Sequence, residues 1–322
     1  MKKALIVGLN QYPGHELKWC DNDAIAISGL METNGDGSPN FDVRQIIDTC
    51  TKEHLQTSIQ QLFADESDIA LLYFSGHGHD ADGGYLVTTD YNEDRLGVRM
   101  TDILQMANTS KCKNKIITLD CCYSGHLGES PWTNDNSVLG FGVTIMAASL
   151  PTQEAEVRGD VQHGTFTGLL IQGLNGGAAD IAGNITPASL YSFVDQSLGA
   201  WQQRPVFKTN ISQFLPIRTI SPKVPKATLR KLSQYFTSPS DVYPLDPSYE
   251  DTNDPTVAHI YAEPYADKDH VAIFKELQLF ASVGLVEPVD ASYMYFAAME
   301  SKACKLTALG LHYWRLSKDK RF

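Results

Sequence analysis

Long apolar runs are absent from this chain of 322 residues. A helix that crosses a bilayer needs roughly 18 or more consecutive apolar residues, so the sequence contains no candidate membrane span. Residues 1–8 join two lysines to a short apolar stretch. About five apolar residues are too few for the roughly 7–15 of a secretion signal. We therefore expect a cytoplasmic protein in which these residues form a strand.

Cysteine is also scarce. Six cysteines are present, two of them adjacent at Cys121 and Cys122, and their spacing does not match a disulfide framework. In a chain without an export signal, such cysteines are expected to be reduced thiols. The sequence therefore points to thiol chemistry rather than to a disulfide-stabilised secreted domain.

An excess of positive charge is the third absence. The net charge is −12, which argues against a general nucleic-acid binder. Residues 1–222 carry 14 Lys and Arg against 25 Asp and Glu, whereas the remaining hundred carry 12 against 13. The acidic excess lies in the part that holds the candidate site described next, so a cationic substrate would be attracted there.

Two apolar runs each end in side chains with chemical function. Residues 69–74 are followed by Ser-Gly-His-Gly, which contains His77, and residues 116–119 by Asp-Cys-Cys-Tyr-Ser-Gly, which contains Cys122. Such runs are typical of buried parallel strands, whose carboxyl ends meet at one edge of a sheet. A thiol becomes a useful nucleophile beside a base, and histidine is a base near neutral pH. We therefore expect His77 and Cys122 to act together.

The rest of the chain alternates predicted strands and helices, which indicates an α/β fold with a mostly parallel six-stranded sheet between two layers of helices. The first helix is expected to bury Ala24, Ile25, Ile27, Leu30 and Met31. The predicted strands are 3–9, 41–47, 69–74, 116–119, 139–148 and 203–207, and the predicted helices are 24–31, 51–63, 101–107, 165–174 and 186–198.

Composition changes after residue 217. Residues 218–257 contain many prolines and separated bases, and we expect an exposed linker that enters a helix near the bases at 218–231, followed by irregular chain at 238–255. Residues 258–322 are predicted to form a small α/β domain with a helix at 270–283, a two-stranded ribbon within 285–298 and a helix at 306–316. This order is compatible with a winged-helix-like module. We interpret it as a regulatory or sensor domain that receives a nucleotide signal or a partner protein, after a peptidase-like domain at 1–217.

The two motifs, in this order and each after a strand, resemble those of the caspase-like cysteine peptidases, and most closely the metacaspases and related bacterial enzymes. The resemblance covers residues 3–215 and includes Gly-Thr-Phe-Thr at 164–167 and Gln-Arg-Pro at 203–205. It implies a caspase-like three-layer sandwich and a cysteine endopeptidase with a Cys-His dyad. A role in bacterial stress, cell-death or antiviral responses is implied in the same way.

Within this resemblance the nucleophile is the cysteine directly before Tyr-Ser-Gly, which is Cys122. Strand alternation agrees, because Asp120 and Cys122 share one face and Cys121 points into the layer below. His77 would help to form the thiolate and then protonate the leaving amine. The backbone N–H groups of Gly78 and Cys122 would stabilise the oxyanion.

The resemblance also implies an acidic S1 pocket for the side chain before the cleaved bond. The matching positions are Cys20, Asp23, Ser75 and Asp120. Two carboxylates can pair a guanidinium bidentately and repel an acidic side chain, so we expect protein or peptide substrates with Arg or Lys at P1 and no cleavage after Asp. The alternative for Asp23 is charge compensation at a helix N-terminus.

Calcium is the one cofactor that the resemblance suggests, and none is expected to be required. Many metacaspases bind calcium after the histidine, where Asp82 and Asp90 offer carboxylate oxygens. The competing interpretation is a solvated acidic loop.

Basic residues constrain any self-cleavage. None lies between Lys115 and Arg158, so the loop at 126–138 offers no site, whereas the bases at 218–231 do. Two other functions remain open at this point: a catalytically silent caspase-like scaffold, and a DNA-binding regulator that acts through the C-terminal module.

Overall fold

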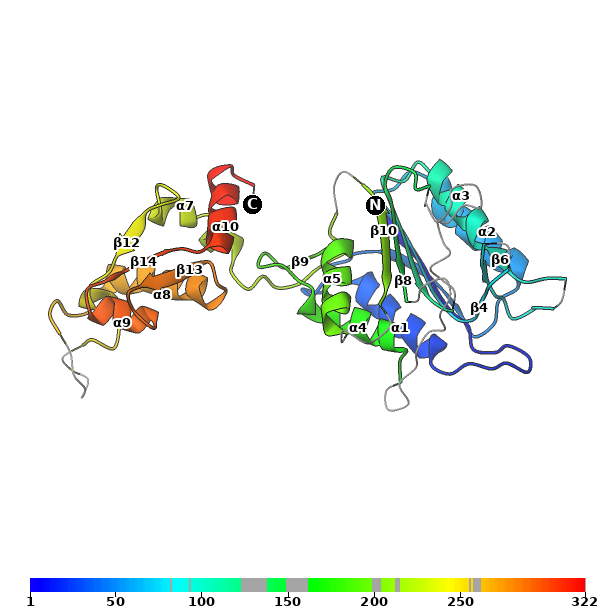
Figure 1. Ribbon diagram of the computed structural model, residues 1–322, viewed down its shortest axis with the longest axis horizontal. Coiled ribbons are helices and arrows are strands. Elements are labelled where there is room, and N and C mark those ends of the chain that lie inside the picture. The colour runs from blue at the N-terminus through cyan, green and yellow to red at the C-terminus, as the bar shows by residue number, and fades with distance from the viewer. Residues whose placement is uncertain are drawn as a thin grey trace. The chain divides into compact units, whose positions relative to one another are not determined.

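The computed structural model describes residues 1–81, 83–92, 94–122, 138–148, 162–198, 204–211, 215–254, 256 and 262–321. The chain divides into two compact units, Met1–Ser221 and Pro222–Phe322, here called the first and the second unit. Figure 1 labels their helices and strands.

The first unit is built around a six-stranded sheet with the order β10-β8-β7-β3-β1-β2. The pairings β1–β2, β1–β3, β3–β7 and β7–β8 are parallel, and only the edge strand β10 runs antiparallel to its neighbour. This confirms the predicted mostly parallel sheet. The strands are β1 (Lys2–Gly8), β2 (Asp42–Ile47), β3 (Ile69–Ser75), β7 (Asn114–Asp120), β8 (Val143–Ala147) and β10 (Val206–Asn210).

Helices cover both faces of this sheet, as Figure 1 shows. One core cluster joins α2 and α3 to one face, and another joins α1, α4 and α5 to the opposite face. Because both faces are covered, every residue of β3 is buried, as expected of a central parallel strand. The helices are α1 (Cys20–Glu32), α2 (Lys52–Ala64), α3 (Met100–Thr109), α4 (Thr165–Gln172), continued by the π-helical turn η2 (Gly173–Gly177), and α5 (Pro187–Ser197).

The prediction of which α1 side chains are buried is wrong for one residue, Ile25. Ala24, Ile27 and Met31 are buried against the sheet, but the side chain of Ile25 is 53% exposed. Positions three and four apart share a helix face, and Ile25 lies outside the face that starts at Ala24.

Two small sheets complete the first unit. β4 (Gly78–His79), β5 (Tyr85–Leu86) and β6 (Val98–Arg99) form an antiparallel sheet directly after β3. β9 (Asn184–Ile185) pairs with β11 (Arg218–Thr219). The buried guanidinium of Arg218 donates hydrogen bonds to the carbonyls of Leu30 and Thr33, so it caps the C-terminal end of α1.

The second unit contains a three-stranded antiparallel sheet with the order β12-β14-β13. Its elements are α6 (Lys226–Leu229), α7 (Leu232–Tyr235), β12 (Val242–Pro244), the 3-10 turn η3 (Pro247–Tyr249), α8 (Lys268–Ser282), β13 (Val286–Val289), α9 (Met294–Met299), β14 (Ala303–Leu306) and α10 (Ala308–Lys318). Among the described residues, no helix is both long enough and apolar enough to cross a bilayer.

The structure differs from the sequence prediction at two places in this unit. Residues 218–257 hold α6, α7 and β12 rather than only irregular chain, and Leu229, Leu232 and Phe236 are fully buried. These apolar residues lie between the basic residues and form part of the core of the second unit. The high content of proline and charge in this segment hid them in the sequence. The predicted ribbon within 285–298 is also wrong, since only 286–289 is a strand and 294–299 is helical.

Candidate active site

His77 and Cys122 leave the sheet at the same edge. Ser75 of β3 pairs with Asp120 of β7, and His77 and Cys122 each follow two positions later. The two chains remain close beyond the paired residues: a Cβ built on Gly78 would lie 2.0 Å from the carbonyl oxygen of Cys122. The topology therefore brings together the two residues that the sequence singled out. Both are partly exposed, whereas Cys121 is 1% exposed, on the opposite side of the strand.

The imidazole of His77 is held by the loop that follows β1. Its Nε2 lies 2.8 Å from the carbonyl oxygen of His15. A carbonyl only accepts, so Nε2 carries the hydrogen in the neutral ring and Nδ1 is left as the basic nitrogen. The ring also packs edge-on against Tyr12, with 4.6 Å between the centroids.

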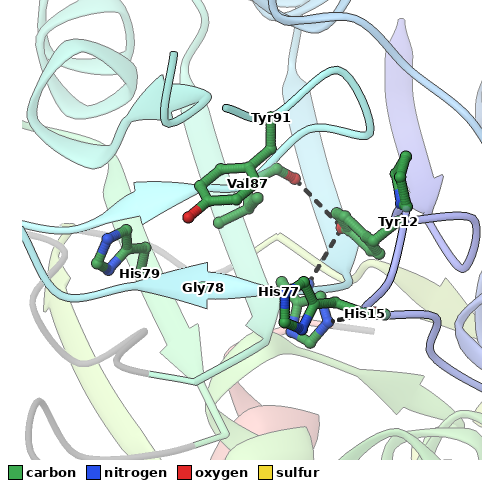
Figure 2. A pocket seen from close by; sticks show the side chains of 8 residues that line it. Tyr12, His15, His77, Gly78, His79, Val87 and Tyr91 are labelled. Carbon is green, nitrogen blue, oxygen red and sulfur yellow. Dashed lines mark hydrogen bonds between the residues drawn. The ribbon is translucent and has the colours of Figure 1, made fainter. Parts of the chain in front are cut away.

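Tyr12 fixes the backbone at the same point. Its hydroxyl accepts a hydrogen bond from the N–H of His77 at 3.1 Å and donates to the carbonyl of Val87 at 3.2 Å, as Figure 2 shows. Tyr12 is 3% exposed, and burial raises the pKa of its phenol far above the usual range, so it remains a neutral hydrogen-bonding group. Neither Tyr12 nor His15 was identified from the sequence, because no local pattern links this loop to His77.

A pocket of about 210 Å³ opens beside His77 (Figure 2). It lies between the loop after β1, the strand β4 and the chain that follows β5. Its walls are mainly aromatic and aliphatic, with the imidazole of His77 on one side. The lining residues are Tyr12, Pro13, His15, His77, Gly78, His79, Val87 and Tyr91.

The backbone N–H of Gly78 makes no hydrogen bond to the neighbouring strand β5. Gly78 is opposite Leu86 in the antiparallel pair β4–β5, and the N–H of Val87 donates to the carbonyl of His77. In that register Gly78 and Leu86 form a non-hydrogen-bonded pair, so the N–H of Gly78 points away from β5. The hydrogen bonds between β4 and β5 therefore leave this N–H available as the predicted oxyanion donor.

The four predicted S1 residues come together from three elements: Cys20 and Asp23 from α1, Ser75 from β3 and Asp120 from β7. The Ser75 hydroxyl donates to Oδ2 of Asp23 at 3.2 Å. A Cβ on Gly164 would lie 2.9 Å from Oδ2 of Asp120 and 3.5 Å from Oδ2 of Asp23, so both carboxylates face one small volume.

Two residues near the start of α4 contact this acidic pair and were not identified as site residues from the sequence. The Thr167 hydroxyl donates to Oδ2 of Asp120 at 2.6 Å. Nδ1 of His163 lies 2.8 Å from Oδ1 of Asp23. The Gly-Thr-Phe-Thr motif at 164–167 was the only signal for this region, and it did not reveal which side chains face the acids.

Burial shapes the electrostatics of the pair. Burial, followed by the charge of Asp120, raises the pKa of Asp23 to about 8. Burial likewise raises the pKa of Asp120, against the hydrogen bonds from Thr167. The Cys20 thiol has its pKa raised to about 12 by burial, so it is a neutral wall of the pocket. Two carboxyl groups in one volume, Asp23 buried and Asp120 partly buried, favour the arrival of a cation, which relieves their mutual repulsion.

Only one of the two calcium candidates, Asp90, lies in the described part of the chain, so calcium binding stays a prediction. Oδ1 of Asp90 accepts from the Thr88 hydroxyl and the N–H of Lys52, and Oδ2 accepts from Arg95. Asp82 lies outside the described residues. No group of three or more His, Cys, Asp or Glu side chains suited to a metal occurs among the residues that are described.

Comparison with known proteins agrees with this geometry. The family model described as the caspase domain matches residues 1–215. Among solved structures, the chain is similar to caspase-1 from Spodoptera frugiperda, with 14% identity, 68% of this chain and 90% of that chain covered, and a TM-score of 0.49. No curated protein matches the chain. Because the family model matches two thirds of its length, the chain belongs to the caspase-domain family of cysteine peptidases.

Proposed function

We propose that this protein is a cysteine endopeptidase that uses a dyad of His77 and Cys122 to cleave peptide bonds after Arg or Lys. The observation that carries the proposal is the acidic pair, the buried Asp23 and the partly buried Asp120, at the same sheet edge as the dyad. A pocket of this charge favours a basic P1 side chain and opposes an acidic one.

The reaction follows from the groups present. Nδ1 of His77 accepts the thiol proton of Cys122 while its Nε2–H remains bound to the His15 carbonyl. The thiolate attacks the scissile carbonyl, and the N–H groups of Gly78 and Cys122 donate to the resulting oxyanion. His77 then protonates the leaving amine, and water, deprotonated by the same imidazole, hydrolyses the thioester.

The pocket beside His77 suits the leaving side of the substrate. The acid that protonates the amine must lie next to the residue after the cleaved bond, and His77 lines this pocket. Its volume of about 210 Å³ and its aromatic and aliphatic walls fit one apolar side chain. We therefore expect an apolar residue to be favoured directly after the Arg or Lys.

The second unit is proposed to regulate access to the peptidase. Its described residues include no group of His, Cys, Asp and Glu suited to a metal. It exposes Tyr293 (69%), Phe296 (42%) and Tyr295 (37%) at the start of α9, which would suit contact with a partner protein or a nucleotide base. The resemblance to bacterial caspase-like enzymes supports a place in stress, cell-death or antiviral responses. A cytoplasmic location is part of the proposal, and the six cysteines, which form no disulfide in the described residues, would suit it.

The test is peptide cleavage by the purified full chain. Fluorogenic peptides that differ only in P1 (Arg, Lys, citrulline or Asp) are offered to the wild type and to Cys122→Ala, His77→Ala and Asp120→Asn variants. We expect cleavage after Arg and Lys only, loss of activity in the first two variants, and a raised KM for basic P1 in the third. An inactive wild type would favour the scaffold alternative, and cleavage after Asp would overturn the specificity.

A further inference from the structure

His163 closes the acidic pocket in this structure. It lies just before α4, and its ring nitrogen Nδ1 is 2.8 Å from Oδ1 of Asp23. The side chain of Asp23 is 3% exposed and that of His163 is 29% exposed. His163 is thus the more exposed partner of a buried carboxyl group.

Asp23 does not depend on His163 for its position. Its Oδ2 already accepts from the Ser75 hydroxyl, and the carboxylate also accepts from the backbone N–H of Gly164. His163 instead contacts the other carboxylate oxygen of Asp23, Oδ1. A guanidinium that bound Asp23 bidentately would need this oxygen as well.

Among the described residues, the other charged groups that act on Asp23 are negative. Asp23 and Asp21 lie on α1 and Asp120 on β7, and the nearby Cys20 and Tyr73 are neutral when protonated. Within the described residues, His163 is the one basic side chain at ion-pair distance from Asp23.

We propose that His163 occupies the place of the P1 cation in the resting enzyme, so that a substrate binds only by displacing it from Asp23. The inference rests on the proposed cleavage after Arg or Lys. His163 thereby sets a threshold for specificity, because only a P1 side chain that replaces its 2.8 Å hydrogen bond leaves Oδ1 of Asp23 paired. A neutral P1 side chain of the same shape that displaced His163 would form no ion pair with Asp23 to replace the lost contact.

The experiment measures binding in the full chain with Cys122→Ala, so that no cleavage is needed. Dissociation constants at pH 7 are compared for two peptides that carry Arg or its neutral isostere citrulline at P1. We expect His163→Ala to tighten Arg binding roughly tenfold, the magnitude of a lost hydrogen bond to a charged group, and to leave citrulline unchanged. His163→Gln, which still donates to Asp23 without charge, should give a smaller gain. His54→Ala, an exposed histidine on α2, is the matched control.

Each other result overturns the inference. Weaker Arg binding in His163→Ala would show that His163 supports Asp23 instead of competing for it, and unchanged binding would show that P1 does not contend for Oδ1. A different result would contradict the proposed function. If Cys122→Ala and the double variant Cys122→Ala/His163→Ala each bind the Arg and citrulline peptides with equal affinity, the acidic pair does not bind the P1 side chain.

Discussion

Replacing Gly78 by alanine tests the geometry on which catalysis depends. A Cβ at this position would lie 2.0 Å from the carbonyl oxygen of Cys122, whereas ordinary contacts are 3.4–4 Å. The carbonyl oxygen of Cys122 is a backbone atom and cannot rotate away like a side chain. The backbone at His77–Gly78 or at Cys122 must therefore move by about 1.4 Å. A misplacement of about 1 Å in a catalytic group costs roughly 100-fold in rate. We therefore expect kcat/KM for an Arg peptide to fall about 100-fold in Gly78→Ala.

The assay separates this effect from general destabilisation. Overpacking costs about 1–3 kcal/mol, so circular dichroism should show a folded protein with a modestly lower Tm. Gly29→Ala is the matched control, because no atom lies within 4 Å of its added Cβ on the exposed side of α1. The control should keep full activity and gain about 0.5–1 kcal/mol of stability. Activity of folded Gly78→Ala within threefold of wild type would refute the idea that this contact sets the catalytic geometry.

Four further outcomes are expected. Because the pKa of Asp23 is raised to about 8, its charge appears only as the pH rises towards and through that value, so KM for an Arg peptide should fall between pH 6 and 9, and Asp23→Asn should abolish the dependence. Thr167→Val removes the hydroxyl that donates to Asp120 and should raise KM for Arg peptides about tenfold, with KM for citrulline peptides unchanged. Arg218→Met leaves two carbonyls of α1 without their donor and should cost about 2–3 kcal/mol in urea unfolding of the full chain. If self-cleavage occurs between residues 218 and 231, intact-mass analysis should locate it after the exposed Lys223 and not after Arg218, which is 7% exposed; a fragment ending at Arg218 would contradict this.

The central strands were predictable because parallel strands covered on both faces leave continuous apolar runs. β3 and β7 follow this rule, and the residues after them stand side by side as the motifs require. The second unit was harder. A short apolar stretch such as 294–299 suits either a helix or a strand, and packing made it helical. In 218–257, prolines and bases hid the few apolar residues that form the core.

The candidate site divides in the same way. His77 and Cys122 were singled out because each follows a strand, and Cys20, Asp23, Ser75 and Asp120 because the family resemblance named their positions; the structure brings these four side chains together, and their role as an S1 pocket stays a prediction. His15, Tyr12, Thr167 and His163 were missed. Each acts through a contact with a residue far away in the chain, and such contacts leave no local pattern.

The amino-acid sequence by itself determined the α/β sheet and the two strand ends that carry a thiol and an imidazole, since period and composition encode which segments are buried strands. Only the tertiary structure decided which nitrogen of His77 is basic, through the carbonyl of His15, and which residue closes the acidic pocket. His163 and Asp23 are separated by 140 positions, and only the packing of α4 beside α1 brings them to 2.8 Å.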